Sequence, residues 1–287
     1  MRTVASKDAY VIGNDYFAGR FTRILSDMGV KATRFSAVPK SISSERVFFS
    51  GEFCTYNNVA NAIDAGADVF SEQLIFSTDD SHNIFSKARN NGQKLCLWGM
   101  DIINPAIACL PGIIGHNNIR NARVDRVGPV SHSKINIIDD SAMHGIALLS
   151  YVFCSGFNNS NHSVLLDGAH QEFVSDHSAL LTFADSGKHA SVYCDSKINY
   201  KERSLAIIGD KIRIVVDMLR QKVLFLNVEE SDKNICDSGL WNYREHHLAR
   251  TEPLAVLIKQ FVTGEANATP YRFMRNVFDM GLRVKSV

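Results

Sequence analysis

The sequence predicts two domains, an α/β domain over residues 1–105 and an α+β domain over residues 106–287. Two observations predict this division. Short apolar runs alternate with helix-length amphipathic segments in the first part of the chain, which is typical of βαβ units on a parallel sheet. Beyond Asn104 and Pro105, strand-like runs follow one another with short turns between them. This second pattern indicates a mostly antiparallel open sheet with helices on one face.

The elements of the first domain follow from two kinds of local pattern. Apolar runs that end at glycine or at polar residues predict strands, and apolar residues spaced three and four apart predict helices. The first strand stops at Gly13, and the first helix stops at Gly29. In chain order, we expect strands at residues 9–12, 31–35, 46–49, 68–71 and 94–98, and helices at residues 17–28, 56–65 and 79–90. Strands joined through helices of this length make a Rossmann-like half.

The second domain begins with an alternating segment and a helix, and a series of strands follows. Two short turns, at residues 185–187 and 209–210, join neighbouring runs closely enough for antiparallel pairing. We expect extended segments at residues 132–138, 163–166, 177–183, 190–194, 204–208, 213–217 and 222–226, and helices at residues 142–154, 253–262 and 271–282.

Composition excludes several classes of protein. The net charge of +1 argues against a nucleic-acid-binding surface. No run approaches the roughly 18 apolar residues that a membrane span requires, and the first residues lack the apolar core of a secretory signal. The six cysteines are scattered without a CxxC pair, as buried thiols in a reducing compartment often are. We therefore expect a soluble, cytoplasmic protein that binds neither nucleic acid nor membrane.

A metal site is not expected. Glu245, His246 and His247 are the strongest candidates for ligands. Two adjacent histidines cannot share a helical face, however, and no third ligand follows at a suitable spacing.

Several segments, taken in order, resemble the Gfo/Idh/MocA family of NAD(P)-dependent sugar and polyol oxidoreductases. AIDAGADVFSEQLIFS is similar to the family segment that contains Glu-Lys-Pro, with Glu72, Gln73 and Leu74 in those places. ARNNGQKLCLWGMDIINPAI resembles the helix, strand and Asn-Pro that follow. IIDDSAMHGIALLSYV resembles the segment with the family's Asp-x-x-x-His pair. The segments 126–129 and 251–254 and the closing helix continue the likeness over nearly the whole chain.

The resemblance implies three catalytic positions, which are His144, Asp140 and Gln73. Oxidation of a hydroxyl needs a base within hydrogen-bond reach of its proton, and histidine ordinarily titrates near neutrality. Asp140 lies four residues before His144, so on a helix both side chains share one face. The alternative is that His144 is a partly buried helical residue and Asp140 an N-terminal cap.

Gln73 stands where the resemblance places a lysine. An amide can donate a hydrogen bond to a sugar oxygen, but it carries no charge and cannot transfer a proton. By analogy with oxyanion donors, the loss of one such contact weakens the transition state by about 2.7–4 kcal/mol.

The resemblance also implies positions for a cofactor, NAD or NADP, in the first domain. The glycine-rich turn keeps Gly13, Asn14 and Ala18, but Asp15 replaces the glycine that lets the backbone approach the pyrophosphate. Asp15 is alternatively a helix N-cap. The second strand should end in an acidic residue that holds the ribose, and Ser36 follows it instead. Arg34 and Lys40 nearby suit the phosphate of NADP or are ordinary surface residues. Ser50 and Glu72 complete the candidates.

Two hypotheses follow. In the first, the protein is an NAD(P)-dependent oxidoreductase acting on a sugar, sugar nucleotide or polyol. In the second, it keeps the fold but binds cofactor poorly or not at all, and serves as a carbohydrate-binding, regulatory or partner subunit. The first accords with the lineage and is the function that we predict. The second accords with the three altered positions and is the alternative. In either case we expect a sugar-like ligand and a homo-oligomer formed through the sheet of residues 163–226.

Overall fold

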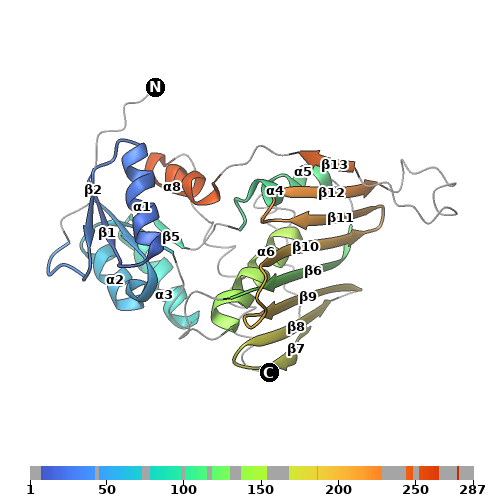
Figure 1. Cartoon of the computed structure of the whole chain (residues 1–287). Helices are drawn as coiled ribbons and strands as arrows, with labels where there is room; N and C mark the ends of the chain where they lie inside the picture. The colour runs from blue at the N-terminus through green and yellow to red at the C-terminus, as the bar shows by residue number, and fades with distance from the viewer. Residues whose placement is uncertain are drawn as a thin grey trace, which may run out of the picture. The chain divides into compact units, whose positions relative to one another are not determined.

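The computed structural model describes residues 8–42, 45–72, 78–97, 101–114, 118–129, 137–153, 168–185, 187–227, 244–247, 252–264 and 277. The chain forms two compact units. The first consists of Met1–Met100 and Glu252–Arg275, and the second of Asp101–Thr251 and Asn276–Val287. Figure 1 shows a sheet with helices in the first unit and a broad sheet in the second.

The first unit contains a parallel five-stranded sheet in the order β2-β1-β3-β4-β5. The Rossmann-like half is confirmed. Its strands are β1 (Ala9–Ile12), β2 (Ala32–Phe35), β3 (Arg46–Phe49), β4 (Asp68–Ser71) and β5 (Leu95–Leu97). Its helices are α1 (Tyr16–Asp27), the 3-10 turn η1 (Gly51–Phe53), α2 (Tyr56–Asp64), α3 (Thr78–Asn90) and α8 (Pro253–Thr263).

The carboxyl ends of neighbouring strands lie level at one edge of this sheet. Ile12 at the end of β1 pairs with Phe35 of β2 and Phe49 of β3, and Phe49 pairs with Ser71 of β4. Gly13, Ser50 and Glu72 each follow one of these strands directly. The parallel register therefore brings the three residues to the same edge, where open α/β sheets bind their ligands.

Helix α8 belongs to the first unit, which corrects the domain boundaries expected from the sequence. Phe261 of α8 packs edge-on against Phe48 and Phe70, with ring centroids 5.6 and 5.7 Å apart. Arg46 also donates a hydrogen bond to the carbonyl of Val262 at 3.3 Å. The boundary at residue 105 had placed this helix in the second domain, because sequence order does not show which core an apolar helix face will join.

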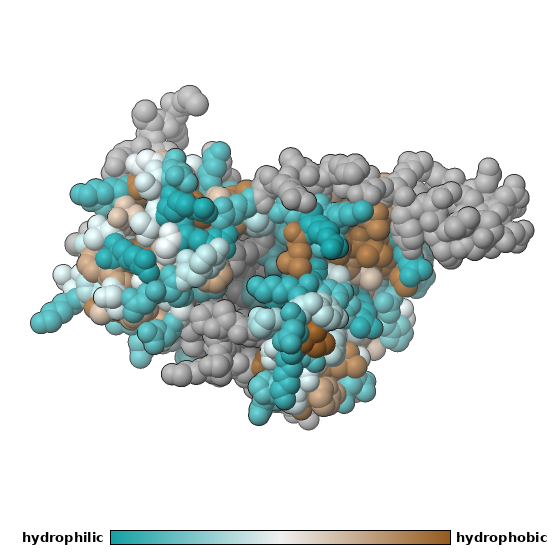
Figure 2. All heavy atoms as spheres, viewed as in Figure 1, coloured by the Kyte–Doolittle hydropathy of each residue, from teal (hydrophilic) through white to brown (hydrophobic). Residues whose placement is uncertain are grey.

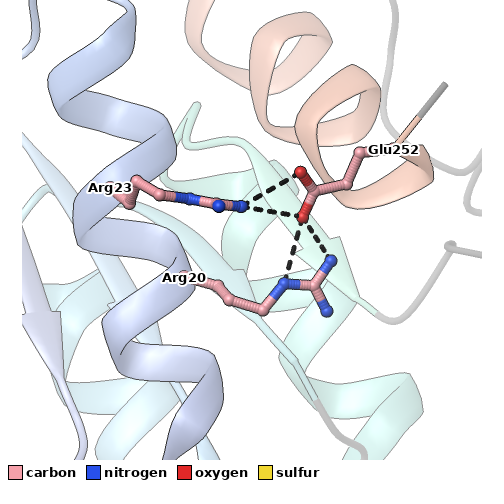
Figure 3. A network of polar contacts seen from close by, with 3 residues as sticks. All are labelled: Arg20, Arg23 and Glu252. Atoms are coloured by element: carbon pink, nitrogen blue, oxygen red, sulfur yellow. Dashed lines mark hydrogen bonds and ion pairs between the residues drawn. The ribbon is translucent and has the colours of Figure 1, made fainter.

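The start of α8 is also held by ionic contacts with α1. Glu252 accepts hydrogen bonds from Arg20 Nε at 3.0 Å and from Arg23 NH2 at 3.1 Å. Figure 3 shows both guanidinium groups converging on this one carboxylate from successive turns of α1. The network lies near the surface, so most of the attachment of α8 comes from its buried apolar face.

The second unit contains an eight-stranded sheet in the order β13-β12-β11-β10-β6-β9-β8-β7. Every neighbouring pair is antiparallel except β6 with β9, and the predicted fold class is confirmed. The strands are β6 (Ile119–Val127), β7 (Gly168–Val174), β8 (Ser178–Asp185), β9 (Lys188–Asp195), β10 (Glu202–Gly209), β11 (Ile212–Asp217), β12 (Lys222–Asn227) and β13 (Arg244–His247). The helices are α4 (Pro105–Ala108), α5 (Leu110–Ile114), the π-helical turn η2 (Ile138–Ala142) and α6 (Met143–Phe153).

Helix α6 covers one face of this sheet. Ten of its residues are buried, the exception being His144. Gly145 lets the helix approach β9 closely, because a Cβ atom there would lie 2.4 Å from Cγ1 of Val192. The helix is therefore held near the sheet at the turn that carries His144.

Several elements of the second unit differ from those expected from the sequence, and others fall outside the described residues. Strand β6, in the middle of the second sheet, was not predicted, and neither were β7 and β13. The segment 132–138 does not extend as a strand to its end, because Ile138 begins the π-helical turn. The expected elements at residues 163–166 and 271–282, apart from the helical residue 277, lie outside the described residues.

On the face seen in Figure 2, polar residues cover most of the first unit, and apolar patches are visible on the second. Among the helices that the structure describes, none is long and apolar enough to cross a membrane.

Candidate functional site

Three charged side chains of the second unit converge on one carboxylate oxygen. Asp101 lies at the start of the unit, Arg126 near the end of β6 and His144 in the first turn of α6. Oδ2 of Asp101 lies 2.5 Å from NH1 of Arg126 and 2.8 Å from Nδ1 of His144. Their side chains are 22%, 8% and 13% exposed, respectively. The carboxylate thus bridges a buried guanidinium and a nearly buried imidazole.

The surroundings keep Asp101 ionised. Burial by itself would raise the pKa of this carboxyl group, but the charges of Arg126, His144 and Arg203 and the hydrogen bond from His144 outweigh it. The pKa of Asp101 is therefore held well below its usual range. Nε of Arg126 is buried and meets no hydrogen-bond acceptor in the described part of the chain. A positive charge in this setting depends on Asp101 for compensation.

This arrangement prepares His144 for proton exchange. When the imidazole is neutral, donation from Nδ1 to Asp101 places the lone pair on Nε2, which is then the basic nitrogen. When it is protonated, the same carboxylate stabilises the imidazolium. The geometry can therefore support general acid or general base chemistry at a hydroxyl group.

His144 was predicted from the sequence, but Asp101 was not. Asp101 follows the last strand of the parallel sheet and precedes Asn104 by three residues. No sequence motif marked this position as a partner of His144. Arg126 entered the prediction only within the segment 126–129 that resembles the family, and the structure places it within β6. A buried arginine on a strand is itself a signal, because it requires a nearby carboxylate.

The other two predicted catalytic residues are only partly placed. Asp140 lies inside the π-helical turn that begins at Ile138, so it does not cap a helix there, and that interpretation is wrong. Its side chain lies outside the described residues, and so does Gln73 altogether.

In the first unit, Asp15 occupies the N-terminus of α1. Its Oδ1 accepts hydrogen bonds from the backbone amide of Ala18 and from the hydroxyl of Ser50, both at 2.8 Å. Oδ2 is buried and has no hydrogen-bond partner within the described residues. The N-cap interpretation of Asp15 is confirmed. The capping carboxylate is also tied to β3 through Ser50.

Two glycines lie against this pair. A Cβ atom on Gly13 would lie 2.0 Å from Oγ of Ser50, and one on Gly51 would lie 2.6 Å from Oδ2 of Asp15. Gly51 also has a φ of +57°, which favours glycine. The space that these glycines leave is therefore filled by the hydroxyl of Ser50 and the carboxylate of Asp15.

The remaining predicted cofactor residues surround the same turn. Asn14 Nδ2 donates to the carbonyl of Ser36 at 3.4 Å. Glu72, 6% exposed, accepts from the amide of Gly51 at 3.4 Å. Arg34 donates from Nε to the carbonyl of Gly13 at 3.1 Å. The structure thus brings the seven predicted positions, Gly13, Asn14, Asp15, Ala18, Ser36, Ser50 and Glu72, to one edge of the sheet.

Among the residues that the structure describes, no group of three or more histidine, cysteine or acidic residues could hold an ion. His246 and His247 lie on strand β13.

Comparison with known proteins relates this architecture to sugar dehydrogenases. No protein-family model and no curated protein match the sequence. Among solved structures, UDP-N-acetylglucosamine 3-dehydrogenase GnnA from Acidithiobacillus ferrooxidans has a TM-score of 0.73 at 16% identity, covering 98% of this chain and 97% of that one. The dehydrogenase MviM from Clostridium difficile has a TM-score of 0.72 at 11% identity, with 98% of each chain covered. Levoglucosan dehydrogenase in complex with NADH and levoglucosan has a TM-score of 0.70 at 10% identity, covering 98% and 97%.

The chain has the fold of these dehydrogenases. The two-domain architecture expected from the resemblance to the Gfo/Idh/MocA family is confirmed over nearly the full length of each chain. One of the similar structures holds NADH, so the fold raises the question of whether this chain's own residues suit a dinucleotide.

The residues present at the turn after β1 do not fit a pyrophosphate. Such a group rests on the backbone amides at the start of the helix, where a glycine allows close approach. Here the carboxylate of Asp15 is already bound to that helix terminus, and Ser50 fills the space beside Gly13. A phosphate at this point would meet a side chain of its own sign.

Proposed function

We propose that the second unit binds a sugar- or polyol-type ligand, and that His144 forms a hydrogen bond with a ligand hydroxyl while Asp101 holds its ring. The observation that carries this proposal is the single oxygen of Asp101 shared by Nδ1 of His144 at 2.8 Å and NH1 of Arg126 at 2.5 Å. Similar structures include a UDP-N-acetylglucosamine 3-dehydrogenase and a levoglucosan dehydrogenase. Their names support a carbohydrate as the class of ligand.

For the chain as it stands, we assign ligand binding without dinucleotide-dependent turnover. The second hypothesis from the sequence, a carbohydrate-binding, regulatory or partner subunit, is the one that the first unit favours. The reason is the carboxylate of Asp15 at the N-terminus of α1, where the fold would otherwise receive a pyrophosphate.

The competing function is NAD(P)-dependent oxidation of the same class of ligand. The paired His144 and Asp101 favour it, because removal of hydride from a carbinol carbon requires a base at the hydroxyl. The two functions share the ligand site and differ in whether the ligand is oxidised.

Calorimetric titration with a panel of sugars, sugar nucleotides and polyols tests the proposal. We expect one class to bind, and Asp101→Asn and His144→Gln each to weaken its binding by about tenfold or more, as loss of a charged hydrogen-bonding group does. Asp210→Asn is the matched control, because Asp210 is also paired with an arginine of the second unit, at an exposed site. Equal binding by all four proteins, or by none, would contradict the proposal.

An activity assay separates the two functions. The ligand found by calorimetry is incubated with NAD or NADP, and the formation of reduced nicotinamide is followed by absorbance. Steady turnover that His144→Gln abolishes would establish the competing oxidoreductase function instead.

A further inference from the structure

The turn between β1 and α1 is built around a side chain of the protein rather than around an open cradle. In a dinucleotide-binding turn, glycines leave space so that the pyrophosphate can approach the amides of the helix N-terminus. In this chain the turn keeps Gly13, but the space beside it is taken by the hydroxyl of Ser50, and Gly51, which follows β3, leaves room for the carboxylate of Asp15.

We infer that the carboxylate of Asp15 occupies the pyrophosphate position as an internal anion, and that this one side chain is the main obstacle to dinucleotide binding. A helix N-terminus attracts negative charge, and Asp15 supplies it through the amide of Ala18. A second anion can bind only if this carboxylate leaves.

The neighbouring residues show that the carboxylate is integrated into the turn. The hydroxyl of Ser50 donates to Oδ1 of Asp15 at 2.8 Å, and Ser50 itself is fully buried. Gly51 has no Cβ atom to meet Oδ2 at 2.6 Å. An ordinary N-cap side chain bonds only to the amides of its own helix. Asp15 also accepts a hydrogen bond from Ser50, which follows β3, and Gly51 leaves room for it.

The charges around the turn also oppose a phosphate. A carboxylate oxygen of Glu72 accepts a hydrogen bond from the amide nitrogen of Gly51 at 3.4 Å. Arg34 is a cation at this edge, and it contacts the backbone carbonyls of Gly13 and Asp15 at 3.1 and 3.4 Å. The guanidinium group of Arg34 therefore already donates hydrogen bonds to carbonyl groups of the turn.

Binding of NADH and NADPH to the full chain tests the inference, measured by calorimetry for the wild type, Asp15→Gly and Asp15→Asn. Gly and Asn both serve as N-caps, so helix α1 should persist in each variant. Asp27→Asn is the matched control, because it removes a carboxylate from the exposed far end of the same helix. Adenosine, which carries no phosphate, serves as the control ligand.

We expect no wild-type binding up to millimolar dinucleotide, and binding at least about tenfold tighter in Asp15→Gly, since a repelling charge at a helix terminus is exchanged for an attracting amide. Asp15→Asn should gain less, and adenosine binding and Asp27→Asn should match the wild type. If circular dichroism shows that Asp15→Gly is unfolded, the increase in dinucleotide affinity of Asp15→Asn becomes the test of the inference.

Micromolar wild-type binding, or folded variants at position 15 that bind no more tightly than Asp27→Asn, would overturn the inference. The experiment concerns the first unit alone and needs no carbohydrate. Its failure therefore leaves the proposed ligand site of the second unit untouched, and failure of that site leaves this result standing.

Discussion

Replacement of Asp101 by asparagine is the substitution that most directly tests the charged cluster of the second unit. Asparagine keeps the shape of the side chain and removes its charge. The guanidinium of Arg126, 8% exposed, would then lack its compensating carboxylate. Breaking a buried ion pair from one side destabilises proteins by about 3–5 kcal/mol. Asp101 is 22% exposed, so we expect the lower end, about 3 kcal/mol.

Urea denaturation followed by circular dichroism measures this effect as a shift in midpoint at unchanged slope. Asp210→Asn is again the control, because its partner Arg120 is 53% exposed and such surface pairs contribute about 0–1 kcal/mol. The double substitution Asp101→Asn with Arg126→Met removes both charges, and it should destabilise less than the sum of the two single changes. A loss at Asp101 no larger than at Asp210, or strictly additive losses, would refute the reasoning.

The effect of Asp101→Asn should depend on pH in a defined direction. The pKa of Asp101 is lower in the folded protein than in the unfolded chain, where an aspartate titrates at about 3.9. Its stabilising contribution is therefore fully present above that value and is lost as the pH falls toward the folded pKa. The difference in unfolding free energy between wild type and variant should therefore shrink in strong acid. A difference that grows as the pH falls below about 3.9 would contradict this assignment.

Three further predictions concern packing and reactivity. Gly145→Ala should destabilise the protein by about 1–3 kcal/mol in urea denaturation through overpacking against Val192, whereas Gly112→Ala, with open space around it, should be neutral or stabilising. Phe261→Ala should lower the free energy of unfolding by about 3–5 kcal/mol, because it removes a fully buried ring from the first unit; a loss below 1 kcal/mol would contradict the assignment of α8 to that core. Burial raises the pKa of the Cys96 thiol, so mass spectrometry after iodoacetamide treatment of the native protein should find Cys109 alkylated before Cys96.

Local patterns predicted the elements of the first unit closely. Strands β3 and β4 begin and end at the expected residues, because each is a short apolar run stopped by polar residues or glycine. Strand β6 was missed although it lies between β10 and β9. Arg120 and Arg123 are both exposed in this strand, and these charged residues interrupt the apolar run by which a strand is recognised from sequence.

The residues around Asp15 were likewise predictable from the sequence only in part. The cap at Asp15 and the glycine at position 13 could be recognised from the sequence, because a helix cap and a tight turn depend on residues close together in the chain. The contact of Asp15 with Ser50 could not, since it requires β1 and β3 to be neighbours in the sheet.

The sequence alone therefore determined the fold class, most strands and helices, and His144 as a candidate acid or base, because these follow from periodicity, turn residues and the resemblance of short segments. Only the tertiary structure decided that Asp101 and Arg126 meet at His144, that α8 joins the first unit, and that Ser50 and Gly51 close around Asp15. Each of these depends on residues far apart in the chain that come together through packing. No local pattern records which strand or helix will become the neighbour of another.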